Sequence, residues 1–179
     1  MAIDLGALLP ILGTLDPLTE LYAQLDAGRP ARLGVPDSAK AACTALLWRR
    51  SRRPVLLVVP REVDAETMVE QVRAWAGDAA VHFPGRAALP FSRDGHDPDV
   101  SWERIGVLSR MARAGATPPL VVASASAITA HTLRPADLGR GPGVVSRGAR
   151  LGLEAFALAL VEAGYEMTPL VEGPGQAAR

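Results

Sequence analysis

The chain of 179 residues has very little cysteine, and Cys43 is the only one. A single cysteine excludes an internal disulfide and a cysteine-rich metal site. The chain also has no net charge, because 19 lysines and arginines balance 19 aspartates and glutamates. Neutrality is a poor sign of a domain that holds nucleic acid by itself, since such binding depends on neutralising phosphates.

Long apolar runs are absent as well. No stretch reaches the roughly 18 residues that a membrane-spanning helix needs. The N-terminal "MAIDLGALLPILGTLDP" is apolar but has no basic leader, and it contains Asp4 and Pro10. A signal peptide is therefore not expected. These absences predict a soluble cytoplasmic protein with no membrane partner.

Lysine is the scarcest charged residue. Eighteen of the basic residues are arginines, and Lys40 is the only lysine. It lies in "GVPDSAKA" (34–41), which has the length and position of a phosphate-binding loop. The question is whether this segment is a working nucleotide site.

Apolar patterning predicts an α/β domain. "PVLLVVP" (54–60) has the continuous apolar character of a strand buried on both faces. Helical periodicity alternates with such strands, which predicts a parallel sheet covered by helices on both faces. Three tryptophans, at 48, 75 and 102, are spaced as core residues of helices. Strands are expected at 31–33, 54–60, 79–84 and from 118, and helices at 16–30, 38–51, 64–77, 99–115 and 151–163.

The 34–41 segment keeps only part of a phosphate loop. Gly34 and Lys40 remain, with Ser38 between them, but Ala39 replaces a glycine that would let the backbone approach phosphate. Ala41 replaces the hydroxyl that would hold Mg²⁺. No acidic residue ends either of the Val-rich strands, although a P-loop ATPase needs one for the metal. We therefore expect a relic loop, without catalytic residues and without a cofactor.

Other polar residues have ordinary structural explanations. Histidines 82, 96 and 131 are too far apart in the sequence to suggest a metal site. Ser124 and Ser126 follow a strand end, where α/β sheets often bind ligands. Because no basic residues accompany them, we expect these serines to cap the helix that starts at 125.

The order of the segments resembles a known family. The degenerate loop is followed by "RPVLLVVPREVDAETMVEQVRAW", "FPGRAALPFSRDGHDPDVSWERIGVLSRM" and "PPLVVASASAITAHTLRP". This resembles the N-terminal UvrB-like module of bacterial transcription-repair coupling factors (Mfd), from about Ala31 to the end. UvrB is similar over the same segments. It carries a long aromatic hairpin for DNA where this chain has a short segment, so the resemblance favours the coupling factors.

The resemblance implies a domain division and a partner. Residues 1–135 would form a UvrB-like, RecA-like domain with a degenerate P-loop. Residues 136–179 would begin a small α+β domain that binds UvrA, and would be incomplete. Arg179 aligns with an arginine of the UvrA-contacting surface, and Arg147 and Arg150 are further charged candidates in the same unit.

The implied function is recruitment without catalysis. In the family, the full protein recognises stalled RNA polymerase, removes it with an ATP-driven DNA translocase and recruits UvrA to begin nucleotide excision repair. The translocase would be an intramolecular partner, and RNA polymerase and DNA would be bound by other domains. Two alternatives stay open: an ATP-binding helicase-type lobe that contacts DNA as UvrB does, and a second domain that is unfolded in this piece.

Overall fold

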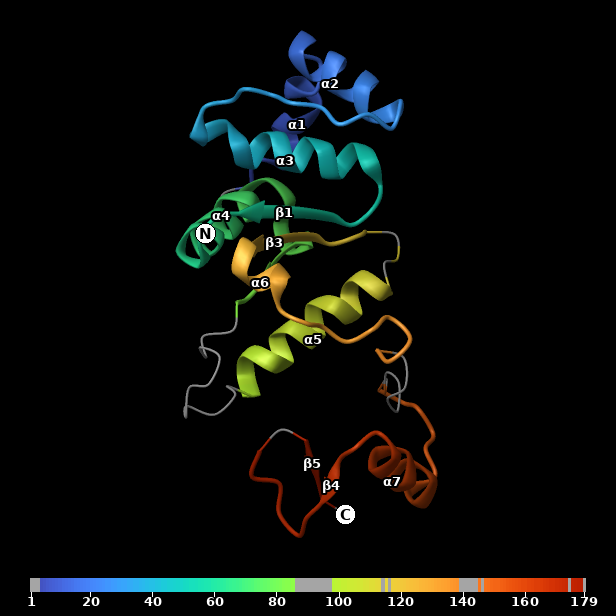
Figure 1. The fold of residues 1–179 in the computed structure, drawn as a ribbon. Coiled ribbons are helices and arrows are strands. Elements are labelled where there is room, and N and C mark those ends of the chain that lie inside the picture. The colour runs from blue at the N-terminus through green and yellow to red at the C-terminus, as the bar shows by residue number, and fades with distance from the viewer. Residues whose placement is uncertain are drawn as a thin grey trace. The chain divides into compact units, whose positions relative to one another are not determined.

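The computed structural model divides the chain into two compact units, Met1–His131 and Thr132–Arg179. Figure 1 shows their elements in chain order. The resemblance predicts a boundary between two functional domains at residues 135 and 136, and that boundary stays a prediction. The residues described are 4–85, 98–113, 115, 117–138, 145, 147–173 and 175–178.

The first unit contains a parallel sheet of three strands. Its strands are β1 (Val55–Val59), β2 (Ala80–Phe83) and β3 (Leu120–Ser124), in the order β1-β3-β2. Both β1 and β2 pair with β3, and Leu120 lies opposite Val55 on one side and Ala80 on the other. Every residue of the central strand β3 is buried, as its Val-rich sequence leads one to expect.

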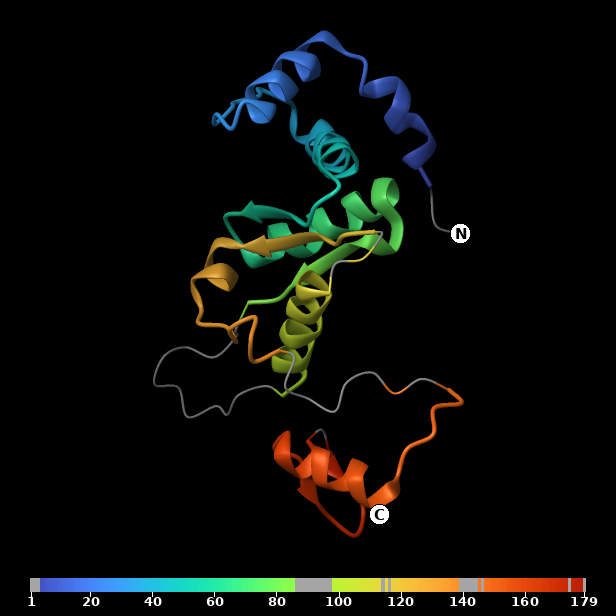
Figure 2. The ribbon, with the colours of Figure 1, turned by 90° about the vertical axis from the view of Figure 1, so that its right-hand side faces the viewer.

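Helices cover both faces of this sheet, which confirms the predicted α/β fold (Figure 2). On one face, α3 (Asp37–Ser51) and α4 (Glu62–Ala76) pack against the sheet through Ala41, Val69 and Val72. On the other face, α5 (Pro98–Ala112) and α6 (Ala125–Thr129) do so through Val107 and Ala127. These two layers of buried apolar side chains form the core of the unit.

The N-terminal helices extend the first unit beyond α3. They are a 3-10 turn at Gly6–Leu8, α1 (Leu9–Leu12) and α2 (Asp16–Asp26). Leu9, Leu18 and Leu21 are buried against Ala45 and Leu46 of α3. α3 therefore packs on the sheet and α4 through one set of residues and on the N-terminal helices through another.

Three predictions about the first unit are wrong. Residues 31–33 form no strand, because the backbone between α2 and α3 pairs with nothing in the described sheet. β1 is not buried on both faces: Leu56 and Val58 are 46% and 43% exposed. Among the described strands β1 lies at an edge of the sheet. Helix α5 packs on β2 rather than on β1, which leaves one face of β1 exposed. Trp48 and Trp75 pack on the core as expected, but Trp102 is 41% exposed.

The second unit contains little regular structure. It has α7 (Leu153–Glu162) and two short parallel strands, β4 (Glu166–Met167) and β5 (Gln176–Ala177). No residue that is described in this unit is buried, and α7 exposes several large apolar side chains. This arrangement contrasts with the layered core of the first unit.

Candidate functional site

The segment 34–41 is mostly helix rather than loop. α3 begins at Asp37, so only Gly34, Val35 and Pro36 precede it as open backbone. Gly34 does not have the positive φ that demands glycine, and a Cβ placed there would meet nothing within 4 Å. A phosphate loop needs glycine so that its backbone can curl round the anion. At Gly34 the backbone conformation does not require glycine.

Two residues of the predicted relic loop, Ser38 and Lys40, lie on the first turn of α3. Ser38 and Lys40 are both exposed, and the Nζ atom of Lys40 lies 2.6 Å from Oδ1 of Asp37. The amide of Ala39 donates to the carbonyl of Pro36 at 2.9 Å, as in an ordinary helix start. Ala41 is 3% exposed and belongs to the core between α3 and the sheet. The position that would carry a metal-binding hydroxyl therefore faces apolar side chains.

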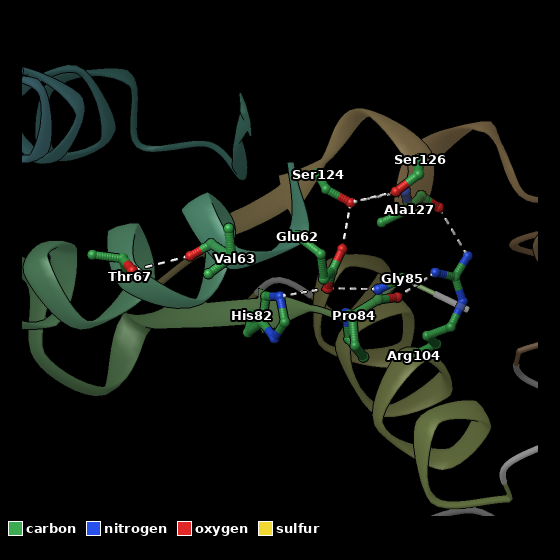
Figure 3. Close-up of polar contacts among 10 residues, drawn as sticks. All are labelled: Glu62, Val63, Thr67, His82, Pro84, Gly85, Arg104, Ser124, Ser126 and Ala127. Carbon is green, nitrogen blue, oxygen red and sulfur yellow. Dashed lines mark hydrogen bonds and ion pairs between the residues drawn. The ribbon is translucent and has the colours of Figure 1, made fainter. Parts of the chain in front are cut away.

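A second polar site lies at the carboxyl ends of β2 and β3 (Figure 3). Its centre is Glu62, the first residue of α4. One carboxylate oxygen accepts the amide of Gly85 at 2.8 Å and lies 3.1 Å from Nε2 of His82. The other accepts the hydroxyl of Ser124, which is itself 2.9 Å from the hydroxyl of Ser126. One side chain thus ties the start of α4 to the ends of two strands.

Electrostatics favours the ionised form of Glu62. Burial alone would raise the pKa of this carboxyl group. The Ser124 hydroxyl, the Gly85 amide and the nearby His82 together outweigh burial and lower the pKa below its usual value. A carboxylate in the first turn of a helix is also stabilised by the helix dipole. Glu62 is therefore expected to be ionised at neutral pH.

Arg104 closes the same region from α5. The side chain is 4% exposed, and its guanidinium lies 4.0 Å from the centre of the Phe83 ring. It donates to the carbonyl of Pro84 at 2.5 Å and to the carbonyl of Ala127 at 3.1 Å. Arg104 therefore links α5 to the end of β2 and to α6, and satisfies carbonyl groups that would otherwise be costly to bury.

This cluster has the composition of a hydrolase triad but not the geometry. In a triad the histidine lies between the serine and the acid. Here the carboxylate of Glu62 lies between Ser124 and His82. Ser124 also accepts the amide of Ala127 at 3.1 Å, which confirms the predicted cap of α6. The edge of an α/β sheet where ligands usually bind is occupied by the chain's own side chains.

Sequence reasoning missed Glu62 and Arg104. Glu62 comes three residues after β1, and helix α4 begins at it rather than at the predicted residue 64. A carboxylate at a helix start that follows an apolar strand is the signal that could have pointed to it. Arg104 has no comparable signal, because nothing in its spacing distinguishes it from the exposed arginines around it.

Two of the three predicted partner-binding arginines lie among the described residues. Arg147 and Arg150 are both exposed and lie in the segment before α7. Gly148, between them, has a φ of 89° and turns the backbone. Arg179 lies outside the described residues. The proposed role of these arginines stays a prediction.

Two searches of the described part of the chain are negative. Its histidine, cysteine, aspartate and glutamate side chains form no group of three or more that could hold a metal ion. Within the same residues, no helix has both the length and the apolar character needed to cross a membrane.

Comparison with known proteins gives one distant relationship. A scan against protein-family models finds no match. The chain is 24% identical over 145 residues to the transcription-repair-coupling factor of Bacillus subtilis, which covers 80% of the chain but 12% of that protein. The resemblance noted from the sequence is thus confirmed. The chain is distantly similar to a small portion of a bacterial transcription-repair-coupling factor.

Proposed function

We propose that this chain is a non-catalytic interaction module of a transcription-coupled nucleotide excision repair factor, and that it recruits UvrA to sites of stalled RNA polymerase. The similarity to a transcription-repair-coupling factor over most of the chain supports this proposal. Such work takes place in the bacterial cytoplasm. DNA, RNA polymerase and ATP-driven translocation belong, in this proposal, to other regions of a longer protein.

The geometry of the 34–41 segment carries the non-catalytic part of the proposal. Helix α3 starts at Asp37, and the charge of Lys40 is matched by that aspartate in the same turn. Ala41 faces the core and offers no oxygen. An anion could still meet the start of α3, but neither a backbone cradle nor a Mg²⁺ ligand accompanies it.

Nucleotide binding is the first test. A fluorescent ATP analogue is titrated with Mg²⁺ into the chain and into a Lys40→Ala variant. We expect no saturable binding by either protein up to about 1 mM, which corresponds to less than about 4 kcal/mol of binding free energy. Micromolar binding that Lys40→Ala removes would instead support the helicase-type lobe.

UvrA binding is the second test. Purified UvrA is immobilised, and the chain is compared with an Arg147→Glu, Arg150→Glu variant. If these arginines meet acidic groups on UvrA, the double charge reversal should weaken binding by about tenfold or more. An Arg29→Glu variant is the control, because Arg29 is exposed in the first unit. Equal binding by all three proteins would place the contact surface elsewhere on the chain.

A further inference from the structure

A groove of about 680 Å³ runs along the outer edge of β2, between α4 and α5. Among the described strands, β2 pairs only with β3, so its other edge is open to the groove. The floor of the groove is apolar and buried, with Val69, Val81 and Val107. Its walls carry exposed charged side chains from both helices: Glu66, Glu70 and Arg73 of α4, and Glu103 and Arg110 of α5.

The charges in these walls are arranged by sign along the groove. Both helices run antiparallel to β2, as crossover helices of a parallel sheet do. Two hydrogen bonds agree with this direction. The amide of Gly85, beyond β2, donates to Glu62 at the start of α4, and Arg110, late in α5, donates to the carbonyl of Asp78, before β2. Glu66 and Glu103 therefore lie near the carboxyl end of β2, which we call the acidic end.

The opposite end of the groove is basic. Arg73 and Arg110 each follow a wall glutamate by seven residues, which is two helical turns or about 10.5 Å. Four residues of β2 span about 13 Å, so the separation of the charges matches the length of the strand. The groove has an acidic end, a basic end and an unpaired strand between them.

We propose that this groove binds a second copy of the same chain, through antiparallel pairing of the two β2 edges. Antiparallel edge pairing has a two-fold axis perpendicular to the sheet. That axis sets α5 beside α5 of the second copy and α4 beside its α4. It brings Glu103 opposite Arg110 of the other copy, and Glu66 opposite Arg73, with each pair formed twice.

Gly106 supports this choice of occupant. It lies on the groove wall almost midway between Glu103 and Arg110, and so next to the axis where the two α5 helices approach most closely. A mid-helix glycine costs about 1 kcal/mol relative to alanine, and a Cβ at this position would meet nothing within 4 Å in the chain itself. The fold of the chain itself does not require glycine at this position. The absent side chain leaves room for a helix of the second copy to pack closely.

The sequence of the edge strand lacks the charged and proline residues that often block pairing. The sequence of β2, "AVHF", contains no lysine, aspartate, glutamate or proline. The one unfavourable contact is at Glu70, which also lies near the axis and would approach its own copy. The ion pair of Glu70 with Arg73 reduces that repulsion. The residues of this groove belong to the first unit and the proposed UvrA contacts to the second, so the two proposals are tested with different variants and can fail independently.

Sedimentation velocity of the full chain tests the proposal. Over roughly 5 to 500 µM, the range in which small interfaces dissociate, we expect a monomer–dimer equilibrium that weakens as salt is raised. Association through exposed apolar side chains would not weaken with salt, and that result would count against the proposal. A chain that stays monomeric throughout would overturn it and leave the groove to a strand from another protein.

Charge swaps provide the decisive control. Glu103→Arg and Arg110→Glu should each weaken the dimer about tenfold or more, because each places like charges opposite one another twice. An equimolar mixture of these two variants should associate again, since each then faces the opposite charge. Failure of the mixture to associate would overturn the proposal. Glu20→Arg, at an exposed position of α2, should leave the equilibrium unchanged.

A final variant distinguishes a blocked dimer interface from an unfolded chain. Gly106→Leu should abolish the dimer, while its thermal unfolding temperature should be equal to or above that of the parent chain, because leucine favours helix and a Cβ at this position meets nothing within 4 Å. A Gly106→Leu chain that is well folded and still forms the same dimer would show that the copies do not meet at this groove.

Discussion

The two units of this chain differ in whether they bury their apolar residues. All the buried hydrophobic residues of the described chain lie between Leu9 and Ala127, in the first unit. In the second unit, α7 has the sequence "LEAFALALVE" and buries none of its residues. Leu153, Leu158 and Val161 of this helix are 61%, 60% and 51% exposed. An apolar sequence therefore predicts a helix in both units, but a core in only one of them.

This difference has an energetic meaning. A fully buried leucine or valine contributes about 1.5–3 kcal/mol relative to an exposed one, so β3 and its neighbours hold the first unit together. A short helix gains most of its stability from packing rather than from propensity. Considered by itself, the second unit lacks that contribution. Two leucine substitutions measure the contrast directly, and a third substitution tests the polar contacts of the first unit. The one with the largest expected effect comes first.

Leu120→Ala should cost the most. Leu120 is 0% exposed at the centre of the sheet, between Val55 and Ala80. Removing three carbons there leaves a cavity that α4 cannot fill, so the free energy of unfolding should fall by about 3 kcal/mol. Urea denaturation followed by circular dichroism measures the change. A loss below about 1 kcal/mol would mean that the first unit has no tightly packed core.

Glu62→Gln should have a smaller effect that depends on pH. The substitution keeps the shape but weakens the bonds to Gly85 and Ser124, which should cost about 1–2 kcal/mol at neutral pH. Because the folded pKa of Glu62 is lowered, its contribution is present above the pKa of the unfolded chain and is lost as the pH falls through the folded value.

The measurement for Glu62 is a series of thermal unfolding curves from neutral to acidic pH. The parent chain should lose stability in acid, and the difference between it and Glu62→Gln should shrink there. A difference that stays constant at every pH would show that the ionised carboxylate is not responsible. Ser51→Ala is a suitable control, since that hydroxyl makes only exposed contacts.

Leu158→Ala should have the smallest effect. The side chain is 60% exposed in α7, so its removal exposes little new surface to water. We expect the free energy of unfolding to change by less than about 0.5 kcal/mol. The same urea titration serves, with Leu120→Ala beside it. A loss as large as that of Leu120→Ala would mean that α7 is covered in solution and that the contrast between the units is wrong.

Much of the fold could be predicted from local patterns. Val-rich runs predicted β1 and β3, and helical periodicity predicted α2, α4, α5 and α7, because both signals depend on neighbouring residues. The order of the strands could not be predicted in this way. We expected β1 to be buried on both faces because its sequence is continuously apolar, but the position of a strand within a sheet depends on long-range pairing.

The candidate sites show the same limit. The residues of the 34–41 segment predict a degenerate loop, since each missing atom has a known task, but α3 begins at Asp37 and most of the segment is helix. The Glu62 cluster could not be predicted. Its members are distant in sequence, and Glu62 and Ser124 alone are 62 residues apart. Only the crossover connections between the strands bring these residues together, and no local sequence pattern predicts their contact.

The middle strand of the sheet is the last of its three strands in the chain. β1 and β2 each pair only with β3, as far as the described strands show. During synthesis, residues 55–59 and 80–83 are therefore made before residues 120–124 exist. Pairings between segments so far apart close slowly, and their apolar side chains stay exposed in the meantime. We expect a nascent chain that stops before residue 120 to lack the strand with which β1 and β2 pair, and to leave their apolar side chains uncovered.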